Sequence, residues 1–206
     1  MKKLYLLRHG QTEFNVKKLV QGRCDSPLTD LGRQQAGMAA AWLKAHNVVP
    51  DKVVSSPLGR AMATASLVAT ELLGPDSAVE SCEGIIERSY GTFEEGPHDA
   101  LPTDVWDPGE DLVPFGGEGS QALQERMVGT LTNIMGAEGI ETLLAVSHGS
   151  ASRQFIKAAA PVDFELPTKL PNCAIMIFDF DDAREEDDTL QCKFTLQQIV
   201  DPQQSH

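Results

Sequence analysis

The sequence is poor in basic and in aromatic residues. It has 17 Lys and Arg against 30 Asp and Glu among 206 residues, a formal net charge of −13 at pH 7, and only 6% of its residues are aromatic. A surface of that sign repels the phosphates of DNA, RNA and anionic membranes, whose binding depends on clustered Lys and Arg. We therefore expect neither nucleic acid nor a membrane among its partners.

Long apolar runs are also missing. The first one, residues 4–7, ends at Arg8 and is shorter than the roughly 7–15 residues of a signal-peptide core. No run approaches the ~18 residues of a membrane span. The remaining composition, 41% hydrophobic and 23% charged, is that of an ordinary globular protein. These features predict a cytoplasmic protein with a single domain over residues 1–206.

Cysteine is scarce and widely spaced. Cys24, Cys82, Cys173 and Cys192 include no C-x-x-C pair, so neither a disulfide framework nor a zinc site is indicated. We expect reduced thiols that are mostly buried, because free Cys is usually interior. No metal and no other cofactor is predicted.

The acidic residues are concentrated in two segments. Residues 94–118 hold eight acids and no Lys or Arg, and residues 179–188 hold seven acids and one Arg. The Pro and Gly residues of the first segment favour turns, which predicts an acidic, lid-like insertion at about residues 92–119. The second segment lies between two predicted strands, residues 174–178 and 193–196, and is expected to form a solvated hairpin loop.

Elsewhere, strand patterns alternate with helix patterns. Short apolar runs predict strands at residues 3–7, 52–55 and 142–146, and apolar residues at helical spacing predict helices at 31–45, 58–73 and 120–135. The expected helix-start residues are Thr29 or Asp30, Ser56 with Pro57, and Ser120. The alternation predicts an α/β fold whose mainly parallel sheet is covered on both faces. Ligands of such sheets bind beyond the carboxyl ends of the strands.

Polar residues at the ends of the three predicted strands form a candidate site. Arg8 and His9 follow the first strand, Arg60 follows the second, and His148 follows the third. Each of these histidines precedes a Gly, which leaves room beside the imidazole. Two guanidiniums, two imidazoles and the N–H groups of the following helices suit a tetrahedral oxyanion. The predicted ligand is the phosphoryl group of a small-molecule phosphate ester.

Five segments, in this order, resemble the histidine phosphatase superfamily, also called the phosphoglycerate mutase-like family: residues 4–15, 22–36, 55–61, 87–91 and 146–149. They extend over most of the chain. The resemblance implies a three-layer α/β/α sandwich with a mainly parallel mixed sheet of about six strands, and catalysis through a phosphohistidine without a metal. Dimers are common in that family, so the resemblance allows a homodimer, with no interface residue indicated.

The resemblance also assigns roles to the site residues. His9 would be the nucleophile that carries the phosphoryl group as a covalent intermediate. Arg8, Arg60 and His148 would hold the non-bridging phosphoryl oxygens. Glu87 would be the acid/base that protonates the leaving oxygen and then deprotonates the attacking water.

Less specific contacts follow from the same resemblance. Asn15, Gly22 and Gly149 would add phosphate contacts, although Asn15 also suits the start of a helix. Glu83 is the next candidate for the acid/base. These assignments complete the predicted site.

Cys82 and Arg88 have the C-x5-R spacing of cysteine-dependent phosphatases, which use a different chemistry. That loop must aim a thiolate and backbone N–H groups at an anion. Glu83 and Glu87 would place two carboxylates in the same loop. The spacing is therefore interpreted as a coincidence.

Within the family, we predict a phosphoric monoester hydrolase. Only 60 residues separate Glu87 from His148, and from residue 89 to residue 147 the only Lys or Arg is Arg126. In the mutases of this family that depend on bisphosphoglycerate, this interval is longer. It carries basic residues that bind a second anionic group of the substrate. A phosphoglycerate mutase is the alternative function, and a non-catalytic phosphate-binding relative is the second alternative. If the acids of residues 94–118 face the pocket, they disfavour multiply anionic ligands.

Overall fold

The computed structural model describes residues 1–161, 164–183 and 193–204. Within them, one mixed sheet has the strand order β3-β2-β4-β1-β5-β6. The strands are β1 (Lys2–Arg8), β2 (Lys52–Ser55), β3 (Glu80–Ser81), β4 (Thr142–Ser147), β5 (Ile175–Phe180) and β6 (Phe194–Val200). The α-helices are α1 (Glu13–Lys17), α2 (Asp30–Ala45), α3 (Gly59–Leu73), α4 (Ser120–Met135) and α5 (Gly149–Ala159). Short 3₁₀ turns are η1 (Glu83–Ile85), η2 (Gly91–Phe93), η3 (His98–Ala100) and η4 (Val113–Phe115).

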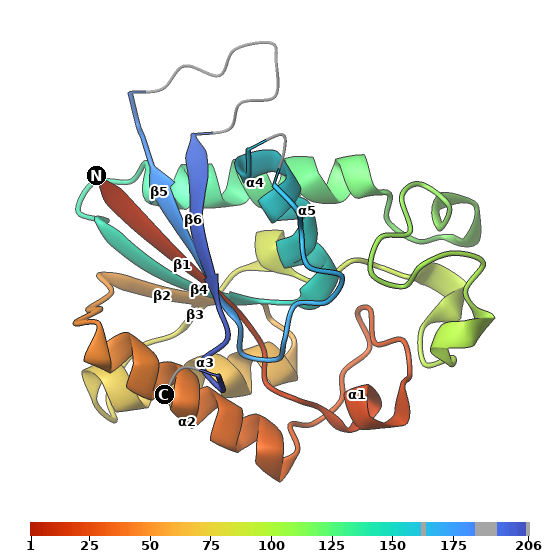
Figure 1. Ribbon diagram of the computed structural model, residues 1–206, viewed down its shortest axis with the longest axis horizontal. Coiled ribbons are helices and arrows are strands. Elements are labelled where there is room, and N and C mark those ends of the chain that lie inside the picture. The colour runs from red at the N-terminus through yellow and green to blue at the C-terminus, as the bar shows by residue number, and fades with distance from the viewer. Residues whose placement is uncertain (162–163, 184–192, 205–206) are drawn as a thin grey trace.

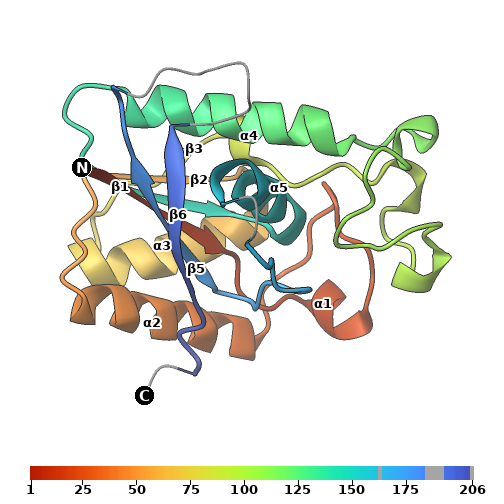
Figure 2. The same cartoon turned by 45° about the horizontal axis from the view of Figure 1, so that its top comes forward.

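The helices cover both faces of this sheet. Helices α2 and α3 lie on one face, and α4 and α5 lie on the other, as Figure 1 and Figure 2 show. Strands β3, β2, β4 and β1 are parallel, and β5 and β6 continue the sheet antiparallel. The predicted three-layer α/β/α sandwich with a mixed sheet is confirmed. Among the described residues, no helix is both long and apolar enough to cross a bilayer.

Strand β1 lies at the centre of the sheet and is apolar on both faces. Leu4 and Leu6 pack toward α4 and α5, while Tyr5 and Leu7 pack toward α2 and α3. Successive side chains of a strand point to opposite faces, so a strand covered on both sides needs a continuous apolar run. The run of residues 4–7 therefore places the next residues, Arg8 and His9, at a fixed edge of the sheet.

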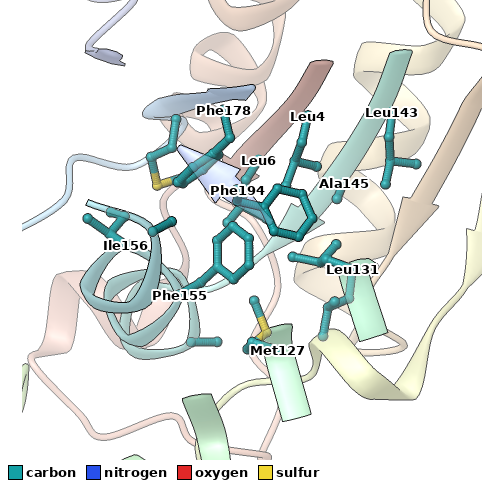
Figure 3. Packing of buried hydrophobic residues seen from close by; sticks show 14 of the residues in the cluster. Leu4, Leu6, Met127, Leu131, Leu143, Ala145, Phe155, Ile156, Phe178 and Phe194 are labelled. Carbon is teal, nitrogen blue, oxygen red and sulfur yellow. The ribbon is translucent and has the colours of Figure 1, made fainter. Parts of the chain in front are cut away.

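The core on the α4 and α5 side contains a cluster of aromatic rings (Figure 3). The ring of Phe155 in α5 packs edge-on against Phe178 of β5 and Phe194 of β6, with centroid distances of 4.9 and 5.0 Å. Edge-to-face pairs of this kind are worth about 0.5–1.5 kcal/mol beyond the burial of their area. The cluster fixes α5, and with it the N-terminus that borders the candidate site.

The predicted N-cap of α2 is correct, and that of α4 is displaced by one residue, although the predicted range of α4, 120–135, is confirmed. Thr29 is the N-cap of α2, and its hydroxyl accepts the N–H of Gly32 at 3.0 Å. Ser120 is the first residue of α4 rather than its cap, and Gly119 occupies the capping position. The Glu110 carboxylate replaces a local cap by accepting the N–H of Gln121 at 3.0 Å.

The predicted capping residues of α3 are wrong, although its predicted range, 58–73, matches the helix to within one residue. The helix begins at Gly59, so that Ser56 and Pro57 precede its first turn. Its first N–H groups, those of Gly59 and Arg60, donate to the carboxylate of Asp25 at 2.7 and 3.3 Å. A carboxylate at this end is favoured by the helix dipole. The cap comes from a residue far away in the sequence, which no local pattern indicates.

The prediction for the C-terminal hairpin is confirmed for its strands, because β5 and β6 pair antiparallel. Residues 184–188 of the predicted acidic loop lie outside the described residues. The prediction of mostly buried thiols is wrong for two of the described cysteines. Cys173 is buried, but Cys24 and Cys82 are only half-buried in connecting segments. Cys192 lies outside the described residues.

Candidate active site

The candidate site lies where β1, β2 and β4 end. Arg8 is the last residue of β1, His148 follows β4, and Arg60 lies in the first turn of α3 after β2. The His9 N–H donates to the carbonyl of Ser147 at 3.0 Å, which ties the end of β1 to the end of β4. The parallel arrangement therefore brings the predicted residues to one edge, as expected.

His9 is held with one ring nitrogen engaged. The side chain is almost fully buried, and its Nδ1 lies 2.7 Å from the carbonyl oxygen of Gly10. Because that oxygen can only accept, Nδ1 must carry a hydrogen. Burial, followed by the positive charges of Arg60 and Arg8, lowers the pKa of His9 well below 6.5. At neutral pH the lone pair is on Nε2, the arrangement that an imidazole nucleophile needs.

The glycine after His9 is required by close backbone packing. A Cβ atom at Gly10 would lie 2.4 Å from the carbonyl oxygen of Gly32 in α2. The Gly10 N–H donates to the Thr64 hydroxyl at 3.1 Å, and that hydroxyl donates to the carbonyl of Arg60 at 2.8 Å. The R-H-G sequence thus packs His9 against α2 and couples it to the start of α3.

Two buried arginines lie beside His9, each with at least one unused donor. Arg60 donates to the carbonyls of Gly22 and Cys24 at 2.7 Å each, and Arg8 donates to the carbonyl of Leu170. The Nε atoms of Arg8 and Arg60 are buried without a hydrogen-bond partner in the described chain. Burial lowers the pKa of Arg8 to about 10 and also lowers that of Arg60. Both arginine donors suit an anion that enters the site.

Glu87 lies at the N-terminus of α5. Its Oε1 accepts the N–H groups of Arg88 and Ala151 at 2.8 and 2.9 Å, and its Oε2 accepts the N–H of Ser150 at 3.2 Å. These donors and the helix dipole fix the carboxylate in one orientation. Glu83, the other candidate, is exposed in η1 and does not line the cavity.

Most of the predicted residues border one cavity of about 60 Å³. Its lining includes the predicted residues Arg8, His9, Asn15, Gly22, Arg60, Glu87 and Gly149. His148 is the exception: it is fully buried beside His9, with ring centroids 5.2 Å apart, and does not line the cavity. The structure therefore brings the predicted side chains together, with His148 next to His9.

Asn15 is placed for both of its predicted roles, a contact with phosphate and a residue at the start of a helix. It lines the cavity, and it also forms a capping box at the start of α1 with Thr12. Its Oδ1 accepts the N–H of Thr12 at 3.1 Å and the side-chain amide of Asn172 at 3.2 Å. With Oδ1 engaged in this way, the amide nitrogen is the part of Asn15 that can donate to an anion.

Residues 92–119 contribute His98, Val105 and Trp106 to the cavity lining, but none of their acids. The Trp106 ring lies over the Arg8 guanidinium at 5.1 Å from its centroid, a cation–π contact. The hypothesis of carboxylates facing the pocket is wrong, because no acid of residues 94–118 lines the cavity and several form contacts elsewhere. Glu118, for example, pairs with Arg126 at 2.8 Å. The wall that this segment adds to the cavity is aromatic and aliphatic.

Arg88 is a buried residue that sequence reasoning did not place in the site. Its guanidinium donates to the hydroxyls of Ser150 and Ser120 at 2.8 Å each, and to the carbonyl of Glu118 at 2.7 Å. It links the end of the 92–119 segment to the start of α5, where Glu87 is held. These bonds also leave it unavailable for the C-x5-R chemistry, and Cys82 does not line the cavity. In the sequence, only its position next to Glu87 indicated that Arg88 could contribute to the site.

The described residues contain no group of three or more His, Cys, Asp or Glu side chains placed to hold a metal ion. The polar side chains around the cavity include two guanidiniums, two imidazoles, two amides and two hydroxyls, with the carboxylate of Glu87 as the one acid among the described residues. This donor set fits a tetrahedral oxyanion.

The buried histidines predict how the protein responds to acid. We expect the His9 ring signals in an NMR titration to show a midpoint below pH 6.5, because burial and two arginines oppose the imidazolium. The unfolded chain takes up this proton near pH 6.5, so the free energy of unfolding should fall as the pH drops below that value. Loss of the signal in a His9→Asn variant identifies it. A midpoint at or above 6.5 would contradict the electrostatic description of the site.

Comparisons with known proteins place the chain in a family. A family model for the histidine phosphatase superfamily (branch 1) matches residues 4–192, which include every predicted site residue. A broad-specificity phosphatase of Saccharomyces cerevisiae is 32% identical over 158 residues, 75% of this chain and 69% of that protein. The probable phosphoglycerate mutase GpmB of Cronobacter sakazakii is 32% identical over 190 residues, 87% of this chain and 86% of that protein. A solved structure of a mutant Entamoeba histolytica phosphoserine phosphatase with phosphoserine has a TM-score of 0.74 at 27% identity and covers 98% of both chains.

Proposed function

The chain belongs to the histidine phosphatase superfamily, and we propose that it is a metal-independent phosphoric monoester hydrolase acting on a small phosphorylated metabolite through a phosphohistidine at His9. One observation carries the proposal. His9 has its Nδ1 bonded to the Gly10 carbonyl, so its Nε2 holds the lone pair beside two buried arginines with unused donors. This is a nucleophile next to an anion site.

In the first step, His9 Nε2 attacks the phosphorus and forms an N–P bond as the bond to the leaving oxygen breaks. The Glu87 carboxyl donates a proton to that oxygen, and the alcohol departs. In the second step, water gives a proton to the Glu87 carboxylate and attacks the phosphorus, and the N–P bond breaks to release inorganic phosphate. Arg8 and Arg60 hold the charge on the phosphoryl oxygens in both steps.

A phosphoglycerate mutase is the second candidate, because proteins named as probable mutases of that kind are among the relatives. A mutase needs cationic groups for the remaining anionic part of its substrate. Arg126, the only Lys or Arg from residue 89 to residue 147, is occupied by the Glu118 carboxylate and by the carbonyls of Gly84 and Ile86. Its engagement outside the cavity favours the hydrolase.

We expect the protein to hydrolyse p-nitrophenyl phosphate and to form little 2-phosphoglycerate from 3-phosphoglycerate. Both activities are measured on the same preparation, the mutase assay with and without 2,3-bisphosphoglycerate. Quenching with alkaline denaturant during turnover with a ³²P-labelled ester should trap an acid-labile, base-stable label on His9. Mutase turnover far above hydrolysis would reverse the assignment, and absence of both activities would favour a non-catalytic phosphate-binding protein.

A further inference from the structure

Ser56, at the end of β2, faces His148. Both side chains are fully buried, and the Ser56 Oγ lies 2.7 Å from His148 Nε2. The backbone of Ser56 is fixed by the sheet, because its N–H donates to the carbonyl of Val146 at 2.9 Å. The hydroxyl therefore meets the imidazole at a position set by the fold rather than by a flexible loop.

The direction of this hydrogen bond follows from counting hydrogens. The other contact of the Ser56 oxygen is the N–H of Leu58 at 3.4 Å, which is a donor. Among the described residues, His148 Nε2 is the only acceptor that the hydroxyl hydrogen meets. If Nε2 carried a hydrogen, both the Ser56 hydrogen and the Nδ1 lone pair would be buried without a partner, whereas a hydrogen on Nδ1 leaves only that one group unmet. Each unmet buried group costs about 1–3 kcal/mol. The hydroxyl therefore donates and Nε2 accepts.

This direction determines which nitrogen of His148 carries the hydrogen. Burial, and then the charges of Arg60 and His9, lower the pKa of His148 well below 6.5, so the ring holds one hydrogen at neutral pH. With Nε2 accepting, that hydrogen is on Nδ1. The Nδ1 atom is buried and has no partner in the described chain, and its ring lies 5.2 Å from that of His9. It is a buried donor beside His9 that meets no acceptor in the described chain.

We propose that Ser56 is a positioning residue that holds His148 with its hydrogen on Nδ1, so that this N–H donates to the phosphoryl group at His9. The identity of the acceptor rests on the proposed function, whereas the position of the hydrogen does not. Ser55, the preceding buried serine, donates its hydroxyl to the Ser56 carbonyl at 2.9 Å and does not contact His148. It provides the matched control.

The first test is the ¹⁵N NMR spectrum of the imidazoles of the full-length protein at pH 7.5, with and without inorganic phosphate. We expect His148 to show a protonated Nδ1 and an unprotonated Nε2, with the Nδ1–H signal shifted by phosphate. A hydrogen on Nε2 overturns the proposal, whether or not the protein is a hydrolase. A protonated Nδ1 in a protein without hydrolase activity leaves the tautomer correct and refutes the proposed function alone.

The second test is kinetic. Ser56→Ala should lower kcat for p-nitrophenyl phosphate about tenfold, the effect of losing one hydrogen bond, with KM changed less than about twofold. Ser56→Thr, which keeps the hydroxyl, should restore most of kcat, and Ser55→Ala should stay near the wild type. The ¹⁵N spectrum of Ser56→Ala should show His148 shifted toward the other tautomer. Unchanged kcat and an unchanged tautomer in a folded Ser56→Ala protein would overturn the proposal.

Discussion

Replacing His9 with Ala is expected to reduce the hydrolysis of p-nitrophenyl phosphate by at least about 10⁴-fold. The variant loses the Nε2 lone pair, and the neighbouring imidazole cannot replace it, because His148 has its Nε2 hydrogen-bonded to Ser56. The measurement is kcat with purified variant, together with trapping of ³²P on the protein. Both signals should disappear.

Two controls test whether the loss of activity in His9→Ala comes from the missing imidazole rather than from unfolding. His46→Ala is the matched control, because His46 is exposed at the end of α2 and stacks on Trp42 away from the cavity. Its kcat should equal that of the wild type. Thermal unfolding of His9→Ala should remain a single cooperative transition. If a folded His9→Ala protein hydrolysed the ester at more than about a hundredth of the wild-type rate, the phosphohistidine mechanism would be wrong.

Replacing Glu87 with Gln should have the second largest effect, and its size should depend on the leaving group. General acid catalysis contributes about 10²–10⁴-fold, so kcat for an alkyl phosphate should fall by that amount. The loss for p-nitrophenyl phosphate should be much smaller when phosphorylation of His9 is rate-limiting, because p-nitrophenolate leaves without a proton. The measurement is kcat and single-turnover phosphorylation for both esters.

Glu83→Gln is the control for Glu87→Gln, since Glu83 is exposed in η1 outside the cavity lining. The side-chain amide introduced by Glu87→Gln would keep one acceptor oxygen but would direct its own N–H groups toward the Ser150 N–H, so a modest loss of stability is expected as well. Equal losses for the two esters would show that Glu87 acts through structure rather than proton transfer. A larger loss in Glu83→Gln would move the acid/base role to that residue.

Local sequence patterns predicted the parts of the fold that depend on local physics. The apolar runs predicted as strands at residues 3–7 and 142–146 lie within β1 (Lys2–Arg8) and β4 (Thr142–Ser147), and the predicted helix 31–45 matches α2 to within one residue at its start. The cap of α3 could not be predicted, because Asp25 reaches it from a separate loop. Strand order is also non-local and was not predicted: the family resemblance implied a mainly parallel mixed sheet of about six strands, and the order β3-β2-β4-β1-β5-β6 comes from the structure.

The site residues that directly follow a strand were predicted from the sequence. The contacts that depend on tertiary packing were not. His9 and Arg8 follow directly from the end of β1, and Glu87 followed from a motif. The network of Arg88 and the contact of Ser56 with His148 join segments that are distant in the sequence. The same holds for the acids of residues 94–118. Their number can be read from the sequence, but the sequence does not show whether their side chains face the cavity.

The central position of β1 has a consequence for how the chain folds during synthesis. Lys3 pairs with Thr142 of β4 and with Asp179 of β5, so both neighbours of this strand are made long after it. At about 5–20 residues per second, the apolar strand waits roughly 7–30 s for β4 alone. Such distant pairings slow folding and leave the strand open to aggregation in the meantime. The residue that begins the proposed reaction is therefore among the first to be made and among the last to be put in place.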